Sequence, residues 1–299
     1  MYQEFYGLRC APFEMTPDPS FLYLGETHRE GLATLVYAVQ SRKGFVVLTG
    51  EVGTGKTTLL HALLSQLDPS MPSAFIFNPR LEPLDFLHMV FDEFGIEETC
   101  LTKAEYLLTL NEFLIDCLKQ DRTALLIIDE AQNLSPEMLE EVRLLSNLET
   151  PTSKLLQIML VGQPELVEML DRPDLRQLKQ RIAMRHHLRP FDATEIDAYI
   201  DERLRLAGYT GKGIFNRSAR KRILAYSGGV PRLVNVLCDS ALLSGYSKGK
   251  QTIGGDIIGE VAQELHLTEV ARDSSRALVR VPDPRSPRRR WLDFLRQGG

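Results

Sequence analysis

Residues 44–64 read GFVVLTGEVGTGKTTLLHALL, and this stretch decides the fold of the chain. The run 44–49 is apolar and of strand length, and residues 57–67 form an amphipathic run typical of a helix. Between them, Gly50 to Thr57 fit the pattern G-x-x-x-x-G-K-S/T. A strand, a glycine-rich loop and a helix in this order predict a phosphate-binding loop and therefore a bound ATP.

Each residue type in this loop has a part in holding a nucleotide. Gly53 and Gly55 permit the tight turn that aims backbone N–H groups at phosphate oxygens, and the following helix adds its dipole. Lys56 reaches the β- and γ-phosphates, and the Thr57 hydroxyl ligates Mg²⁺. A chance glycine-rich turn is the alternative, but it would not require the flanking strand and helix. The predicted nucleotide-binding residues are Gly50, Glu51, Val52, Gly53, Thr54, Gly55, Lys56, Thr57 and Thr58.

A second apolar run, 125–128, ends in two acidic residues, Asp129 and Glu130. A buried strand that delivers an acid to the carboxyl edge of a sheet is the expected place for a second Mg²⁺ contact, so we assign Asp129 to the metal. Glu130 is expected to polarise a water for attack on the γ-phosphate. The alternative is an ordinary surface Asp-Glu pair at a strand end. The order of the motifs along the chain favours the functional interpretation.

Four further residues are candidates for catalysis. Gln163 follows the strand 155–161, where its amide could orient the attacking water or, alternatively, cap the next helix. Arg176 and Arg181 lie before the last strand, either as exposed cations or as an arginine finger that enters a neighbouring subunit. Arg232 begins a helix after Gly228-Gly229-Val-Pro231, where it is either part of a good helix start or a contact from a lid to the phosphates.

The pattern along the chain predicts an α/β architecture, a parallel sheet covered by helices, followed by a small all-helical lid. Helices are expected at 104–119 and at 135–148, where Ser135 is a candidate N-cap. From Asp192, which begins a candidate capping box, strands cease. We predict a nucleotide-binding domain over 1–190, a helical lid over 191–268 and a flexible basic tail over 269–299. Strand-like runs occur at 44–49, 73–78, 124–129, 155–162 and about 182–188, and lid helices at about 192–207, 215–227, 230–244 and 254–267.

Composition agrees with an ordinary globular protein of 299 residues, with 43% hydrophobic and 25% charged residues. No stretch of the sequence has the roughly 18–20 consecutive apolar residues that a membrane span needs. The first residues do not resemble a secretory signal, so the cytoplasm is the expected compartment. Eight arginines and three aspartates give 272–299 a charge of +5, which leaves −10 for the rest because the whole chain carries −5. Such a split suggests an acidic partner for the tail, although most basic tails are simply solvated.

The motifs, in their order, resemble those of the AAA+ ATPases, a class of P-loop NTPases: a Walker A motif, a Walker B motif, a sensor residue at Gln163, a finger region at 176–181 and a second sensor at Arg232. The resemblance narrows to the ExeA family, the general secretion pathway protein A ATPases, over about residues 1–268. It is carried by MYQEFYGL (1–8), HREGLATLVYAV (28–39), the loop segment, LLIIDEAQNLSPEMLEEVRLLSNLET (125–150), LLQIMLVGQPEL (155–166) and SGGVPRLVNVLCDSAL (227–242).

This resemblance implies a Mg-ATP-dependent, oligomeric ATPase that assembles a type II secretion channel with a partner membrane protein. Close relatives accompany envelope-export loci, and distant ones are transposition ATPases that act on duplex DNA, which is the alternative function. Residues near Tyr23 and His28 would flank the adenine. The family usually continues into a membrane span and a periplasmic domain, whereas this sequence ends soon after Arg288-Arg-Arg-Trp291. Either the chain is naturally short or a membrane part lies beyond it, with the ATPase associated with the inner membrane.

Overall fold

The computed structural model of the chain describes residues 1–14, 21, 23–77, 81–151 and 153–270. Within them, residues 1–269 form one compact unit. The basic tail predicted from the sequence lies, from residue 271 on, outside the described residues.

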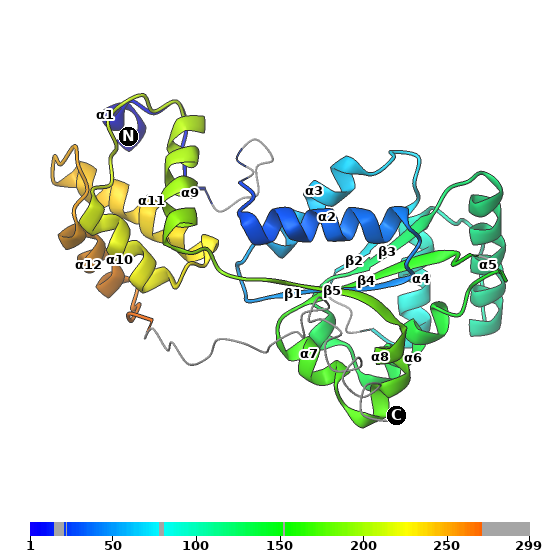
Figure 1. The fold of residues 1–299 in the computed structure, drawn as a ribbon. Coiled ribbons are helices and arrows are strands. Elements are labelled where there is room, and N and C mark those ends of the chain that lie inside the picture. Colours follow the sequence, from blue (N-terminus) through cyan, green and yellow to red (C-terminus); the bar gives the residue numbers. More distant parts are fainter. Residues whose placement is uncertain (15–20, 22, 78–80, 152, 271–299) are drawn as a thin grey trace, which may run out of the picture. The chain divides into compact units, whose positions relative to one another are not determined.

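A parallel sheet forms the centre of the first part of this unit (Figure 1). Its order is β2-β3-β4-β1-β5, and every neighbouring pair is parallel. All residues of β1, β3 and β4 are buried, which explains why these strands are continuous apolar runs in the sequence. The predicted α/β class is confirmed. The strands are β1 (Phe45–Gly50), β2 (Ser73–Ile76), β3 (Ala124–Ile128), β4 (Leu156–Gly162) and β5 (Ile182–Leu188).

Helices cover both faces of the sheet. Two of them pack with Val46 and Leu48 of β1 on one face, and the others pack with Phe45 and Val47 on the opposite face. Figure 1 shows α2 above the sheet and α7 and α8 below it. The first pair is α2 (Glu26–Gln40) and α3 (Lys56–Gln66); the opposite face carries α4 (Pro83–Phe94), α5 (Lys103–Lys119), α6 (Pro136–Leu145), α7 (Glu165–Leu170) and α8 (Arg176–Arg181), with the short helices η2 (Ala131–Asn133) and η3 (Pro173–Leu175).

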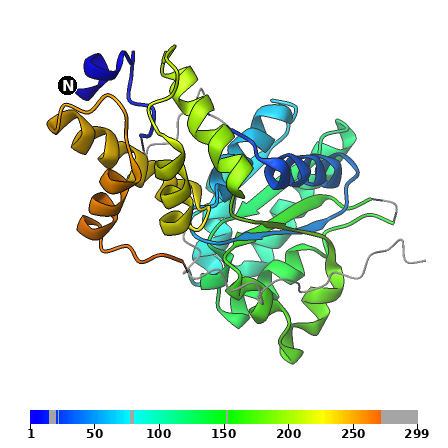
Figure 2. The same ribbon diagram turned by 60° about the vertical axis from the view of Figure 1, so that its left-hand side comes forward.

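The rest of the unit is helical and has its own apolar core. The helices are α9 (Ala193–Leu206), α10 (Arg217–Ser227), α11 (Pro231–Ser247) and α12 (Gly255–Glu264). The N-terminal helix α1 (Tyr2–Tyr6) lies beside them in both views (Figure 2), and Tyr6, Leu8 and Phe13 belong to the same core. The Tyr2 hydroxyl donates a hydrogen bond of 2.5 Å to Oδ1 of Asp239, which lies on α11. The predicted domain over 1–190 groups these N-terminal residues with the sheet, whereas in the structure they pack with the C-terminal helices. The domain boundary at residue 190 stays a prediction.

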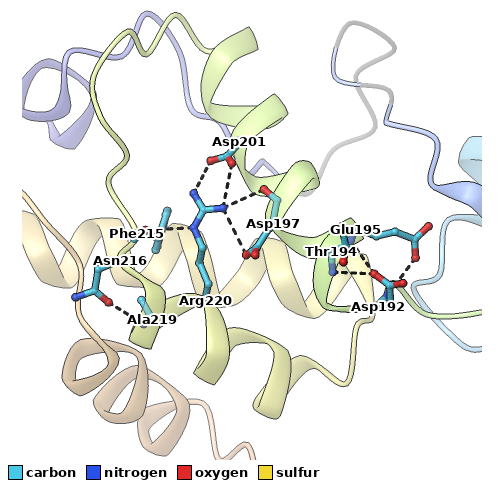
Figure 3. A network of polar contacts seen from close by, with 9 residues as sticks. All are labelled: Asp192, Thr194, Glu195, Asp197, Asp201, Phe215, Asn216, Ala219 and Arg220. Atoms are coloured by element: carbon cyan, nitrogen blue, oxygen red, sulfur yellow. Dashed lines mark hydrogen bonds and ion pairs between the residues drawn. The ribbon is translucent and has the colours of Figure 1, made fainter.

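Two predicted helix starts are confirmed by their hydrogen bonds. The Ser135 hydroxyl accepts from the backbone N–H of Met138 at 3.2 Å at the start of α6. The Asp192 carboxylate accepts from Thr194 and Glu195 N–H groups, both at 2.8 Å, while the Glu195 carboxylate accepts from Asp192 N–H at 3.0 Å (Figure 3). These side chains satisfy backbone donors that the helix itself leaves unpaired.

A mostly buried arginine of α10 joins this helix to α9 (Figure 3). The Arg220 guanidinium is 17% exposed and donates from Nε to the carbonyl of Phe215 at 3.2 Å and from Nη1 to the carbonyl of Asp197 at 3.1 Å. It also makes a two-point contact with the Asp201 carboxylate. α9 and α10 are therefore held together by one side chain as well as by their apolar contacts.

Replacing Arg220 by leucine is expected to lower the free energy of unfolding by about 1–2 kcal/mol, because several hydrogen bonds to a mostly buried cation are lost. Arg205→Leu is the matched control: its side chain is 65% exposed and, among the residues that the structure describes, pairs only with Glu202 within α9. An exposed pair of this kind contributes below about 0.5 kcal/mol. Urea unfolding followed by circular dichroism measures both, and equal losses would contradict the assigned role of Arg220.

Candidate active site

The loop between β1 and α3 has the backbone conformation that its glycines require. Gly53 and Gly55 have φ of 80° and 96°, in the left-handed region that disfavours other residues. The surroundings are also close: a Cβ on Gly53 would lie 2.8 Å from Arg232 Cβ, and one on Gly55 would lie 3.1 Å from His28 Nε2. Both glycines are therefore demanded by conformation and by space.

Lys56 lies at the first position of α3 and is held inside the loop. Its Nζ donates to the carbonyls of Gly50 at 2.8 Å and Glu51 at 3.1 Å, and the residue is 7% exposed. Burial lowers the pKa of the ammonium, while the nearby carboxylates of Glu130 and Asp129 act in the opposite direction. Gly50 and Glu51 thus contribute carbonyl oxygens that hold the lysine at the mouth of the loop.

Thr57 and Asp129 come together from α3 and the end of β3. Thr57 Oγ1 lies 3.4 Å from Asp129 Oδ2, although 72 residues separate them in the sequence. Asp129 is 6% exposed, and burial raises the pKa of its carboxyl, while the N–H of Glu130, donating to Oδ1 at 2.8 Å, acts in the opposite direction. A hydroxyl and a mostly buried carboxylate, which meet near the Lys56 ammonium, are a donor set that suits Mg²⁺.

Glu130 is joined to the end of the neighbouring strand β4. Its backbone has φ of 51°, a left-handed conformation that is uncommon for a non-glycine residue. Gln163 Nε2 donates to Glu130 Oε2 at 3.2 Å, so the expected proximity of Gln163 to the acidic strand is present. Gln132 Nε2 donates to the same oxygen. No role for Gln132 was predicted from the sequence, although its position two residues after Glu130 indicates that it lies close to this carboxylate.

The remaining three arginines differ in where they lie. Arg232 is the second residue of α11, its backbone N–H donates to the carbonyl of Gly53 at 3.3 Å, and its side chain lines the cavity at the loop. Arg176 is exposed, and its side chain makes no ion pair or hydrogen bond within the described residues. Arg181 donates to the carbonyl of Ser146 at 3.3 Å. Arg176 and Arg181 are not among the residues that line the cavity, so this chain does not bring them to its own loop.

A cavity of about 680 Å³ lies above the loop. Val52 to Thr58 and Glu130 line one part of it, and Tyr23, His28, Phe191 and Tyr199 line another. These rings contact one another, with centroids 5.6 Å apart for Tyr23–Phe191 and 5.3 Å for His28–Phe191. The aromatic wall has the character of a base-binding surface. Tyr23 and His28 were expected near the base from the family resemblance, whereas Phe191 and Tyr199 were not predicted from the sequence.

His28 connects this aromatic wall to the loop. Its Nε2 lies 2.8 Å from the carbonyl of Thr54, and the residue is 3% exposed. Burial lowers the pKa of the imidazole, which favours the neutral ring. Because a carbonyl can only accept, the Nε2 of the neutral ring carries the proton.

Comparison with known proteins identifies the family. A family model described as an AAA domain matches residues 39–170, which include β1, the loop, β3 and β4. Over 259 residues, or 86% of its length, the chain is 45% identical to General secretion pathway protein A of Aeromonas hydrophila. The chain belongs to the AAA+ ATPases. It spans 47% of that relative's length, so about half of the relative has no counterpart here.

Solved structures resemble this ATPase in fold. Drosophila ORC bound to DNA aligns with a TM-score of 0.66 at 15% identity, covering 89% of this chain and 66% of that one. Aeropyrum pernix ORC2, in ADPNP and ADP complexes, aligns with a TM-score of 0.63 at 16% identity, covering 89% of this chain and 74% of that one. Cdc6p of Pyrobaculum aerophilum aligns with a TM-score of 0.62 at 18% identity, covering 83% of this chain and 71% of that one. At these identities the likeness concerns the fold alone.

Among the described residues, none of the helices combines the length and apolar character needed to cross a bilayer.

Proposed function

We propose that this ATPase is a Mg-ATP-dependent motor or assembly factor of a secretion or envelope-export system. The observation that carries the proposal is the 45% identity, over 86% of this chain, to a protein named General secretion pathway protein A. The active-site geometry supplies the ATP-dependent part of the proposal, and the relative's name supplies the biological process.

ATP is held by the loop, the aromatic wall and the lid. The triphosphate lies against the backbone N–H groups of residues 50–58 and the N-terminus of α3. Lys56 exchanges its two carbonyl partners for the β- and γ-phosphates, at little cost because it is already in place. The base occupies the wall of Tyr23, His28, Phe191 and Tyr199.

Thr57 and Asp129 hold the magnesium ion. The bound Mg²⁺ would supply neutralisation of the negative charge on the β- and γ-phosphate oxygens. The contact between the two side chains supports this assignment, since a hydroxyl and a carboxylate from separate elements already meet beside Lys56.

Glu130 polarises the water that attacks the γ-phosphate, and Gln163 helps to orient it. Glu130 lines the cavity from which a water would approach, and Gln163, which is not among the lining residues, donates to the Glu130 carboxylate. Lys56, Glu130 and Gln163 thus come from three separate elements of the sheet part.

Arginines from the helical lid and from an adjacent copy of the chain complete the site. Arg232 contacts the phosphates from the lid, because α11 is already joined to Gly53 by a backbone hydrogen bond. Arg176, unpaired among the described residues, enters the site of an adjacent copy as the arginine finger, with Arg181 the second candidate. Catalysis therefore requires a homo-oligomer.

The ATPase works in the cytoplasm, at the inner membrane, through a secretion partner protein or a segment beyond this sequence. Duplex DNA is the other partner considered, with the protein acting as a DNA-binding ATPase that regulates transposition. The net charge of −10 outside 272–299 disfavours DNA, because a polyanion is repelled by an acidic surface.

Steady-state ATP hydrolysis with and without duplex DNA tests which partner applies. We expect turnover that requires Mg²⁺ and does not change with DNA at physiological salt. Stimulation by DNA that disappears at higher salt would contradict the secretion proposal and support the DNA-binding alternative, because phosphate contacts weaken as salt rises. Lys56→Ala provides the blank for contaminating activity.

A further inference from the structure

The short helix after Glu130 carries a residue to which the proposed mechanism gives no part. Gln132, in η2, joins Glu130 to the end of β4 through its side-chain amide. Its Nε2 donates to Glu130 Oε2, and its Oε1 accepts from the backbone N–H of Gln163 at 3.1 Å. One amide thus connects the ends of two adjacent strands of the sheet.

The neighbours of Gln132 fix which way its amide faces. A backbone N–H can only donate, so the oxygen of the amide faces Gln163. The NH₂ group then faces Glu130, whose ionised carboxylate can only accept. Gly162 leaves the space for this arrangement, because a Cβ there would lie 2.7 Å from Gln132 Oε1.

The two oxygens of Glu130 consequently have different surroundings. Oε2 receives hydrogen bonds from both Gln132 Nε2 and Gln163 Nε2. Oε1 has no hydrogen-bond partner within the part of the chain that the structure describes, and Glu130 lines the nucleotide cavity. Oε1 is therefore the oxygen left to accept a hydrogen bond from a water in that cavity.

We propose that Gln132 is a positioning residue for ATP hydrolysis: it holds Oε2 of Glu130 so that Oε1 faces the attacking water. The inference rests on the proposed role of Glu130. A glutamate side chain rotates about three bonds, and two amide donors on one oxygen restrict that freedom. Restriction matters because a displacement of about 1 Å in a reacting group costs about 100-fold in rate.

Two substitutions of Gln132 in the full chain test this role. Gln132→Glu keeps the length and the acceptor for Gln163 N–H but places a carboxylate oxygen against Glu130. Gln132→Met keeps the length and removes both hydrogen bonds. The matched control is Gln263→Glu, the same change of charge at an exposed position of α12.

We expect kcat to fall about 100-fold in Gln132→Glu and about 10-fold in Gln132→Met, since the reacting oxygen is misplaced. The dissociation constant for a fluorescent ATP analogue and the melting temperature should match those of Gln263→Glu. Turnover equal to the control in both variants overturns the proposal. A loss of turnover that comes with an equal loss of affinity or with a fall in melting temperature also overturns it, because Gln132 then acts on binding or folding.

A double substitution shows whether Gln132 acts through Glu130. Adding Gln132→Met to Glu130→Gln should produce no further loss of the residual rate, because the basic carboxylate that Gln132 positions is already gone. A further 10-fold loss, roughly the full single-variant effect, would overturn the proposal. If Glu130→Gln alone keeps full turnover, it is the proposed role of Glu130 that fails. Failure of the Gln132 inference alone leaves Glu130→Gln inactive and both Gln132 variants active.

Discussion

Lys56→Ala is expected to lower kcat/KM for ATP hydrolysis by about 100-fold or more, because a preorganised charge at the phosphates is lost from a site shielded from water. The side chain is already buried and held by the carbonyls of Gly50 and Glu51, so its charge is in place at the loop. Nucleotide affinity should fall as well, since this lysine is proposed to contact ATP in the ground state and in the transition state.

The control for this substitution is Lys43→Ala, a lysine that is exposed and lies just before β1. Its loss should leave turnover and affinity within about twofold of the unchanged protein, as expected for an exposed charge far from the nucleotide. Hydrolysis measured by phosphate release and affinity measured with a fluorescent ATP analogue check both variants. Unchanged hydrolysis in Lys56→Ala would mean that the loop is not the site of turnover.

Glu130→Gln is expected to bind ATP and fail to hydrolyse it. The amide is nearly isosteric with the carboxylate but cannot accept a proton from water, and loss of a general base costs about 100- to 10,000-fold. Affinity should be kept, because Mg²⁺ is assigned to Thr57 and Asp129 and the phosphates to the loop. The variant should therefore hold ATP unhydrolysed.

The same change at Glu168, an exposed residue of α7, is the matched control. Retained ATP after rapid gel filtration and a single-turnover assay distinguish trapping from failure to bind. Full turnover in Glu130→Gln would remove this residue from catalysis. Loss of ATP binding would instead point to a structural role at the end of β3.

Where a pattern depends on neighbours in sequence, the sequence predicted the fold well. Three of the five expected strands, β1, β3 and β4, are buried throughout, and strands of this kind form short apolar runs in a sequence. Ser135 and Asp192 were expected at helix starts because a cap acts on N–H groups only two or three residues away. The amphipathic helix α4 was not predicted, although Glu82 and Pro83 mark its start.

Packing between segments far apart in sequence was outside the reach of such patterns. Tyr6, Leu8 and Phe13 belong to the core of the C-terminal helices, and no local pattern distinguishes a residue that packs there from one that packs on the sheet. The aromatic wall has the same origin: Phe191 and Tyr199 meet Tyr23 only because the chain returns to it after about 170 residues.

For the proposed active site, the residues assigned to phosphate were predictable from the sequence alone, because the loop from Gly50 to Thr57 is contiguous and its chemistry requires glycine, lysine and threonine at fixed spacing. The tertiary structure decided how Glu130 is held. Its partners Gln132 and Gln163 are brought together by the parallel pairing of β3 with β4, and a hydrogen bond between two strand ends leaves no periodic trace in the sequence. Directional contacts of this kind depend on the register of the sheet, which is fixed only when the whole core packs.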